Sequence, residues 1–405
     1  MMGPQLFFSL PFMMSLFPII VTSILLLFFI YIGKRLIPPS WRVSARALAW
    51  VLLLLLALTV PLGFIVRGSN SPWLPWFNYG FGLYSLLITF TILHDVFHFS
   101  LSGSQFTVTT FRKLFNRLSK RVPQKAEHKT RREFLRGASR VGVLGASAAV
   151  FGYGASRAAA MPTLHRIDVA IKDLPTALDG LTIAQLSDVH IGQLAGEPEY
   201  VARIVTAVNS ADVDILALTG DFVDGSVERL RENFAPLGLM KAKYGAFFAT
   251  GNHEYYSGAE KWMAYFRSLN WDVLENEHRV LDINGAQLVL AGVLDYKGSR
   301  NCNPSEALHN APVDVPRILL AHNPETAFLT DGLNIDLQLS GHTHAGQYFP
   351  ATWLVHWVHK YAQGLNWRNA MQIYVNSGTG YWGPAIRTTD ITGEITLITL
   401  KTARV

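Results

Sequence analysis

Seven side chains of the kinds that bind metal ions lie between residues 188 and 344 of this 405-residue chain. They are two aspartates, one asparagine and four histidines: Asp188, His190, Asp221, Asn252, His322, His342 and His344. Imidazole and carboxylate ligands without thiolates favour manganese, iron or zinc over calcium and magnesium. Seven ligands are too many for one tetrahedral ion but suit a pair of divalent ions that share a carboxylate. The sequence therefore predicts a site for two metal ions.

Each group of ligands follows a short apolar run that predicts a buried strand. The runs are 183–186, 215–218, 246–249, 318–321 and 337–339. A single Asp or Asn after a strand would be an ordinary turn residue. Because open α/β sheets bind their ligands at the carboxyl ends of strands, five such endings are expected to meet in one polar site.

Helical patterns alternate with these strands, at 200–209, 226–240 and 261–269, and Asn284-Gly285 predicts a hairpin turn. The alternation predicts an α/β domain with central β-sheet layers flanked by helices. The chain has one cysteine, Cys302, which excludes an intrachain disulfide and a thiolate cluster.

The order of the polar motifs is similar to that of a known family. In chain order the motifs are Asp188-Val189-His190, Gly220-Asp221-Phe222-Val223-Asp224, Gly251-Asn252-His253-Glu254, His322 and Gly341-His342-Thr343-His344. They resemble the calcineurin-like metallophosphoesterases over about residues 180–350. Within that family the resemblance is to membrane-associated, twin-arginine-exported phosphodiesterases.

The resemblance implies a metal-dependent phosphoester hydrolase with two divalent ions, Mn, Fe or Zn. It assigns the first ion to Asp188, His190, Asp221 and His344, with Asp221 as the bridge, and the second ion to Asp221, Asn252, His322 and His342. Such a pair would activate a water for attack on phosphorus and clamp the phosphoryl oxygens. His253 is the candidate for protonating the leaving oxygen, and Asp224 the candidate for orienting His253.

Two positions depart from the family pattern. Ser187 stands where many members have glycine, and Gly225 stands where the Ser/Thr phosphatases of the family have arginine. The missing guanidinium counts against a phosphoprotein phosphatase. Arg387 could supply a phosphate-binding guanidinium from the C-terminal strands, the alternative being a solvated surface arginine.

The first hundred residues contain three apolar runs, 16–36, 47–66 and 77–99. Each has roughly the ~20 residues that a membrane-spanning helix needs. Half of the chain is hydrophobic and 16% is charged, which is more apolar than an average soluble domain. A buried core helix is the alternative for each run, but three runs joined by short loops favour transmembrane helices.

The distribution of positive charge predicts the topology. The first loop carries Lys34, Arg35, Arg42 and Arg46, and the segment 102–140 carries eleven cations against two glutamates. By the positive-inside rule, both are cytoplasmic, and the domain after residue 160 lies on the outer face of a bacterial cytoplasmic membrane. Because the basic charge is confined to this segment, it gives no support for nucleic-acid binding by the C-terminal domain.

The segment Thr130-Arg131-Arg132-Glu133-Phe134-Leu135-Arg136 resembles a twin-arginine export signal, which implies the export machinery as a partner. The alternative is a chance arginine pair before an ordinary fourth span. The predicted organisation is three transmembrane helices in 1–101, a basic cytoplasmic linker in 102–137, a fourth apolar segment in 138–160 and the metallophosphoesterase domain in 161–405.

Two further stretches carry polar or aromatic groups outside the metal motifs. His94 and His98 share a helix face at the end of the third run, with Asp95 within reach. They predict either a polar membrane interface or a metal, proton or lipid-headgroup site. The aromatic insert 349–361 predicts either a helix packed on the sheet or an interfacial segment with Trp353 and Trp357 at headgroup level.

Together these patterns predict a membrane-anchored phosphoesterase. Its substrate would be a phosphodiester or pyrophosphate of a lipid or cell-envelope precursor. A UDP-diacylglucosamine-type pyrophosphate is an alternative, although nucleotide-linked substrates are normally cytoplasmic. An alternative of another class is a non-catalytic membrane sensor or transport partner, which the complete ligand set disfavours.

Overall fold

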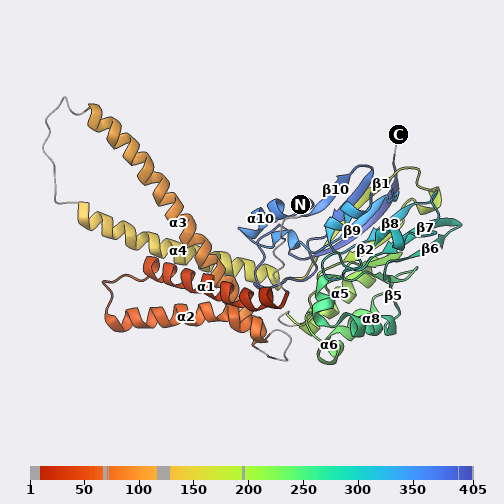
Figure 1. The fold of residues 1–405 in the computed structure, drawn as a ribbon, viewed down its shortest axis with the longest axis horizontal. Coiled ribbons are helices and arrows are strands. Elements are labelled where there is room, and N and C mark those ends of the chain that lie inside the picture. The colour runs from red at the N-terminus through yellow and green to blue at the C-terminus, as the bar shows by residue number, and fades with distance from the viewer. Residues whose placement is uncertain are drawn as a thin grey trace, which may run out of the picture. The chain divides into compact units, whose positions relative to one another are not determined.

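The chain separates into two compact units in this computed structural model, which describes residues 10–66, 71, 73–115, 128–193, 197–390 and 392–403. One unit comprises Met1–Ile65 with Trp76–Gly152, and the other Val66–Pro75 with Tyr153–Val405. Long helices build the first unit, and strands with shorter helices build the second (Figure 1). The finer domain limits expected from the sequence stay predictions.

Four long helices contain the apolar runs of the N-terminal half. They are α1 (Leu10–Leu36), α2 (Val43–Val66), α3 (Leu74–Phe115) and α4 (His128–Ala158). Ile32, Val60 and Tyr84 lie in an apolar core between the first three helices. The side chains of residues 10–22 and 101–132 are outside the described part, and with them the two arginines of the predicted export signal.

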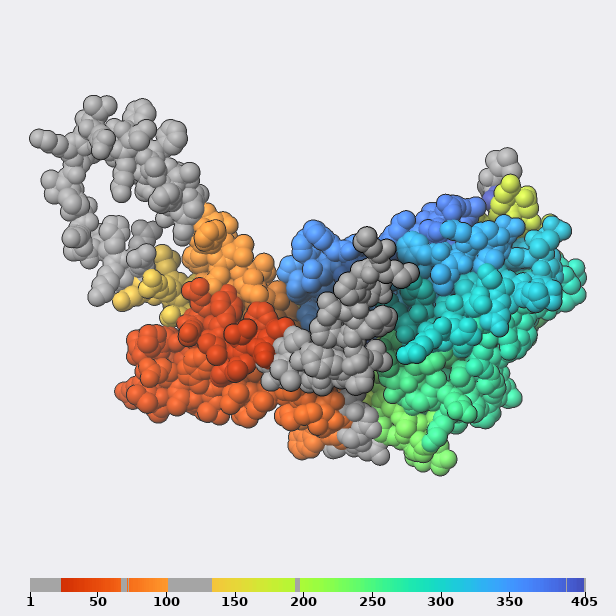
Figure 2. Space-filling model, viewed as in Figure 1, coloured from red at the N-terminus to blue at the C-terminus, as the bar shows by residue number. Residues whose placement is uncertain are grey.

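Among the described residues, two helices are long and apolar enough to cross a membrane: Val43–Val66 and Leu74–Ser100. They contain the second and third predicted spans. The first predicted span lies within α1, and the predicted segment 138–160 lies largely within α4. Leucines of α2 such as Leu52 and Leu55 are 57% exposed, so α2 presents apolar side chains outward. Residues 23–66 appear in red to orange in Figure 2.

The second unit contains two six-stranded sheets of mixed direction. The first has the order β1 (Thr163–Ile171), β12 (Glu394–Thr402), β2 (Thr182–Leu186), β3 (Ile215–Leu218), β4 (Ala246–Phe248) and β5 (Trp271–Val273). The second has the order β10 (Gly364–Arg368), β11 (Met371–Val375), β9 (Leu337–Ser340), β8 (Arg317–Leu320), β7 (Ala286–Gly292) and β6 (Glu277–Ile283).

Both sheets are mainly parallel at their centres. Strands β2, β3, β4 and β5 run parallel, as do β7, β8, β9 and β11. Strands β6 and β7 form an antiparallel hairpin, and its turn residues Asn284 and Gly285 have positive φ angles of 54° and 83°. This backbone geometry is what an Asn-Gly turn provides, so the hairpin predicted from the sequence is confirmed.

The two sheets pack face to face. Ile183, Ile215 and Ile398 of the first sheet share a buried core with Leu290 and Leu337 of the second. Strand residues alternate between the two faces of a sheet, and these side chains lie on the faces that meet. They are fully buried because the other sheet covers them. The interior is thus a double β layer.

Helices cover the outer faces of this double layer. The described helices of this unit are α5 (Glu197–Ala211), α6 (Val227–Phe234), α7 (Asn252–Ser257), α8 (Ala259–Ser268), α9 (Pro304–Ala307) and α10 (Ala351–Val358), with 3₁₀ turns at Thr176–Leu178, Ala235–Leu239, Pro324–Leu329 and His344–Gly346. On the first sheet, Phe234 contacts Phe266 of α8 and Trp271 of β5, with ring centroids 5.1 and 5.4 Å apart. The predicted α/β class, with sheet layers flanked by helices, is confirmed.

Candidate metal centre

Strand register determines where the ligand-bearing loops begin. In the first sheet, Leu218 of β3 pairs with Leu186 of β2 on one side and with Phe248 of β4 on the other. In the second sheet, Leu320 of β8 pairs with Leu339 of β9. Because paired strands of the same direction end at the same level, the loops after them leave each sheet at one edge. The predicted ligands lie on these loops.

Three of the predicted ligands form one compact group. The Nε2 atoms of His190 and His344 are 3.1 Å apart, and Asp188 Oδ1 lies 3.3 Å from His344 Nε2 and 3.9 Å from His190 Nε2. All three residues are buried. Burial raises the pKa of Asp188, but the imidazoles of His344 and His322 outweigh this effect and lower the pKa below its usual range. An ionised carboxylate facing two imidazole nitrogens suits a divalent cation.

A second group lies around Asp221. Its Oδ2 atom is 3.0 Å from His322 Nε2, which is 3.3 Å from His342 Nδ1. Burial and the neighbouring His322 lower the pKa of His342 to about 3, which favours the neutral form that ligates metals. Within the described residues the Oδ1 atom of Asn252 is buried and has no hydrogen-bond partner. A cation at this group would satisfy that oxygen, so these residues also fit a metal ion.

The backbone at these ligands adopts a conformation that is uncommon for residues with side chains. Positive φ angles between 50° and 72° occur at Asp188, His190, Asp221, His342 and His344. Such angles cost energy and are concentrated at functional sites. Two glycines allow the close approach of the loops. A Cβ atom on Gly251 would lie 2.2 Å from Asp221 Oδ1, and a Cβ atom on Gly341 would lie 2.2 Å from Asp188 Oδ2.

Asp224 connects the first metal group with His253. Its Oδ2 atom is 2.7 Å from His190 Nδ1, and its Oδ1 atom is 2.5 Å from His253 Nδ1. A carboxylate that accepts from Nδ1 leaves Nε2 of the same ring available. Burial lowers the pKa of His253, but the charges of Asp221 and Asp224 outweigh it and raise the pKa to about 9. The predicted orienting contact between Asp224 and His253 is therefore present in the geometry.

Several residues at the site were not expected from the sequence. The carboxylate of Glu254 accepts hydrogen bonds from the backbone N–H groups of Asp221, Phe222 and Gly251, which holds the Asp221 loop against the start of α7. Gln193 donates from Nε2 to Asp224. Glu254 was visible in the Gly-Asn-His-Glu motif, whereas Gln193 carries no sequence signal.

Aromatic side chains surround His253. The ring centroid of Tyr256 lies 5.3 Å and that of Trp382 lies 5.8 Å from the His253 ring. Tyr256 is 73% exposed and Trp382 is 38% exposed. These residues come from α7 and from the loop before β12, which are distant in sequence, so no local pattern links them.

Arg387 is fully buried, and its guanidinium donates to the backbone carbonyls of Ser377 and Gly380 at 3.0 and 2.7 Å. It is therefore not a solvated surface arginine, and its contact with a phosphate stays a prediction. Gly378 in the same loop approaches His344, because a Cβ atom there would lie 2.7 Å from His344 Nδ1. The position of Arg387 suits support of this loop.

The aromatic insert forms α10 at the surface of this unit, where it is drawn in blue in Figures 1 and 2. Trp353 and Trp357 are 55% and 75% exposed, and the helix buries Val355. His359 caps the C-terminus of the helix, and its ring centroid lies 5.6 Å from that of His342. The insert is therefore a helix with an exposed aromatic face that ends beside the second metal group.

Comparison with known proteins agrees with this geometry. The family model described as calcineurin-like phosphoesterase matches residues 181–346. The chain is similar to a transmembrane protein with metallophosphoesterase domain from Danio rerio, with 37% identity over 265 residues, 62% of this chain and 60% of that protein. It is similar to an uncharacterized metallophosphoesterase from Helicobacter pylori, with 40% identity over 227 residues, 54% of this chain and 60% of that protein.

The uncharacterized metallophosphoesterase YkuE from Bacillus subtilis is 28% identical over 290 residues, which cover 67% of this chain and 98% of that protein. The matches to the zebrafish and Helicobacter proteins span 60% of the length of each. The matched region contains the complete set of ligand motifs on the two-sheet fold described above. This chain therefore carries a calcineurin-like metallophosphoesterase domain.

Proposed function

We propose that the protein is a membrane-anchored phosphoesterase with two divalent metal ions, which hydrolyses a phosphodiester or pyrophosphate bond of a lipid or cell-envelope substrate. This proposal is supported by two groups that contain six of the seven predicted ligands, all buried except the half-buried His342. The buried Oδ1 atom of Asn252, which has no hydrogen-bond partner among the described residues, supports it further. Asp188, His190 and His344 would hold the first ion, and Asn252, His322 and His342 the second, with Asp221 shared. When bound, the two ions would lower the pKa of a water molecule and neutralise charge on the phosphoryl oxygens.

The chain's own residues then supply the proton. With Nδ1 of His253 bonded to Asp224, the Nε2 atom lies 3.9 Å from Asp221 Oδ2, on the side of the ligand groups. The contact with Asp224 orients His253 so that Nε2 can donate a proton to the leaving oxygen. Asp224 fixes the ring and stabilises its positive charge.

The lipid part of the proposal depends on α10. Exposed Trp353 and Trp357 on a short helix are typical of an interfacial segment. The contact between His359 and His342 brings the end of this helix to the ligand groups, so a substrate held in a lipid surface could reach them. The exposed leucines of α2 and the two candidate membrane helices support anchoring.

The test is hydrolysis by the purified full chain in detergent, stripped of metal and then supplied with Mn, Zn, Fe or Mg. Bis(p-nitrophenyl) phosphate is compared with the monoester p-nitrophenyl phosphate. We expect metal-dependent diester hydrolysis, and we expect His253→Gln to lower kcat about 10²–10⁴-fold, the usual contribution of a general acid. His309→Gln, which changes an exposed histidine away from the ligands, is the matched control.

Unchanged hydrolysis by Asp221→Asn or His253→Gln would show that these residues are not catalytic. Binding of two metal ions per chain without turnover of either ester would instead support a ligand-binding sensor.

A further inference from the structure

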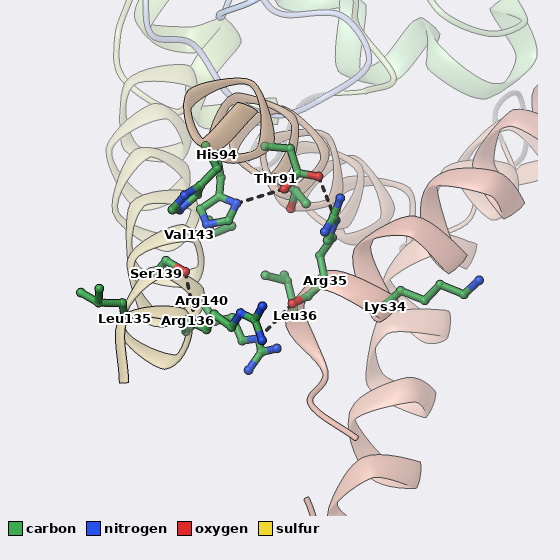
Figure 3. A pocket seen from close by; sticks show the side chains of 12 residues that line it. Lys34, Arg35, Leu36, Thr91, His94, Leu135, Arg136, Ser139, Arg140 and Val143 are labelled. Atoms are coloured by element: carbon green, nitrogen blue, oxygen red, sulfur yellow. Dashed lines mark hydrogen bonds and ion pairs between the residues drawn. The ribbon is translucent and has the colours of Figure 1, made fainter. Parts of the chain in front are cut away.

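A polar cavity of about 550 Å³ lies in the helical unit among α1, α3 and α4. Its size is within the ~300–1,000 Å³ range of small-ligand pockets. Figure 3 shows that side chains from all three helices surround it. The segments that meet there are the end of α1, the part of α3 with His94 and Asp95, and the first half of α4. Charge counting predicts that each of these segments lies at the cytoplasmic side.

The single carboxylate among the lining residues, Asp95, is already neutralised. Its Oδ2 atom accepts from Arg35 Nε and from the Tyr31 hydroxyl, each at 2.8 Å. Its Oδ1 atom lies 3.2 Å from His94 Nδ1. Both carboxylate oxygens are therefore used within the protein, and Asp95 has little capacity to balance further positive charge.

Arg136 and Arg140 also line the cavity, one helical turn apart on α4. Arg140 donates from Nε to the backbone carbonyl of Arg35 at 3.0 Å, which ties α4 to the end of α1 and leaves its terminal nitrogens available. Neither arginine forms an ion pair with a carboxylate in the described part of the chain. Two guanidinium groups held four residues apart on one helix face favour an anion between them.

His94, which also lines the cavity, has a buried polar atom without a partner among the residues that the structure describes. The Nε2 atom of His94 is buried and has no hydrogen-bond partner among the described residues. Buried polar atoms are rarely left without a partner, and an exception calls for a ligand, an ion or a water molecule. Because Nδ1 of the same ring contacts Asp95, the ring orientation is determined and Nε2 is the atom left for a ligand.

We propose that this cavity binds a phosphate-bearing anion, with the guanidinium groups of Arg136 and Arg140 as the main contacts and His94 as a further one. Guanidinium groups match phosphate oxygens in geometry and charge. Anionic lipids are concentrated in the cytoplasmic leaflet, and basic pockets between membrane helices on that side bind their headgroups. A soluble phosphate compound has the same chemistry. The site is separate from the proposed metal centre and does not depend on hydrolysis there.

The experiment uses the full chain, stripped of metal and kept in detergent micelles. Native mass spectrometry measures the affinity for phosphatidylglycerol against phosphatidylcholine, which has no net charge, and calorimetry measures binding of inorganic phosphate. We expect Arg136→Gln to weaken binding of the anion about three- to tenfold, the effect of losing one hydrogen bond of ordinary strength. Arg42→Gln, which removes an exposed cation outside the cavity, should leave it unchanged.

Preferential binding of phosphatidylglycerol that Arg136→Gln weakens would identify a lipid headgroup as the source, and phosphate binding with the same sensitivity would identify a soluble compound. The proposal is overturned if neither anion binds more tightly than phosphatidylcholine. It is also overturned if Arg42→Gln weakens binding as much as Arg136→Gln, because the effect would then be one of total charge.

Asp95→Asn tests whether these residues form a binding site or only a structural cluster, because only a binding site predicts a higher affinity for the anion in this variant. Removal of the carboxylate frees Arg35 and makes the cavity more positive, so the affinity for phosphatidylglycerol should rise about threefold or more. Weaker binding by a variant that elutes as the parent does in size exclusion would contradict the proposal. Arg136→Gln, whose side chain is exposed, still provides the test if Asp95→Asn does not fold.

Discussion

The carboxylate of Asp224 contacts both His190 of the first metal group and His253. Asp224→Asn should therefore weaken metal affinity about 10–100-fold, as loss of an outer-shell partner commonly does, and should also lower kcat. His253→Gln should lower kcat and leave metal affinity unchanged. Metal titration followed by steady-state kinetics measures both quantities. If both variants lost metal to the same extent, His253 would be a ligand and not a proton donor.

Gly251 provides the space that the Asp221 carboxylate occupies. In Gly251→Ala the new Cβ atom would lie 2.2 Å from Asp221 Oδ1, which is too close for two atoms that are not bonded, so the carboxylate or the loop must shift. We expect metal affinity to fall at least about tenfold and the domain to lose about 1–3 kcal/mol of stability, as overpacking does. Thermal unfolding and metal titration measure these effects. Gly145→Ala, whose Cβ atom would meet no atom within 4 Å, is the control and should leave metal affinity unchanged.

Cys302 should react slowly with alkylating reagents. Burial raises the pKa of its thiol to about 11, compared with about 8.5 for an exposed thiol. The thiolate is the reactive form, so at pH 8 the folded protein should react about 100-fold more slowly than the urea-unfolded chain. Below the pKa, the rate should rise about tenfold per pH unit. Mass spectrometry after iodoacetamide treatment measures it, and equal rates for the two states at pH 8 would show that the thiol is not shielded.

At the scale of an element, α10 is the feature that would separate a lipid substrate from a soluble one. Replacement of Trp353 and Trp357 by serine removes exposed aromatic area, so folding should be unaffected. Hydrolysis of a phosphodiester lipid in vesicles should fall about thirtyfold or more, because each of the two aromatic side chains contributes about 1 kcal/mol or more when it is buried in the interface.

The matched control for α10 is Trp367→Ser, which changes a 59% exposed tryptophan on β10. It should leave both activities unchanged. Hydrolysis of bis(p-nitrophenyl) phosphate by the α10 variant should also be unchanged. An equal loss for the vesicle and the soluble substrate would assign α10 to the structure of the active site and not to lipid contact.

At the scale of the whole molecule, the distribution of cations predicts on which side of the membrane the metal centre lies. Alkaline phosphatase folds into an active form only outside the cytoplasm, so a fusion after Val405 should be active in cells. A fusion after Lys120, within the predicted cytoplasmic segment, should be inactive. The reverse pattern would place the metallophosphoesterase domain in the cytoplasm and would favour a nucleotide-linked substrate.

The sequence by itself determined which residues could bind metal and at which strand ends they lie. This was possible because buried strands and tight turns leave local patterns, such as the apolar run before Asp221 and the Asn284-Gly285 pair. The order of the motifs was enough to identify the family before any distance was known. The long apolar runs likewise predicted helices that the structure contains.

Only the tertiary structure decided how distant residues share a site. Three features join segments that are far apart in the chain. They are the division into two packed sheets, the contact of the Asp224 carboxylate with both His190 and His253, and the position of His359 beside His342. Arg387 is the clearest case. Its sequence surroundings are compatible with a surface residue, but it is buried, and backbone carbonyls of its own loop accept the hydrogen bonds of its guanidinium. Such contacts arise from packing between elements, which local composition does not encode.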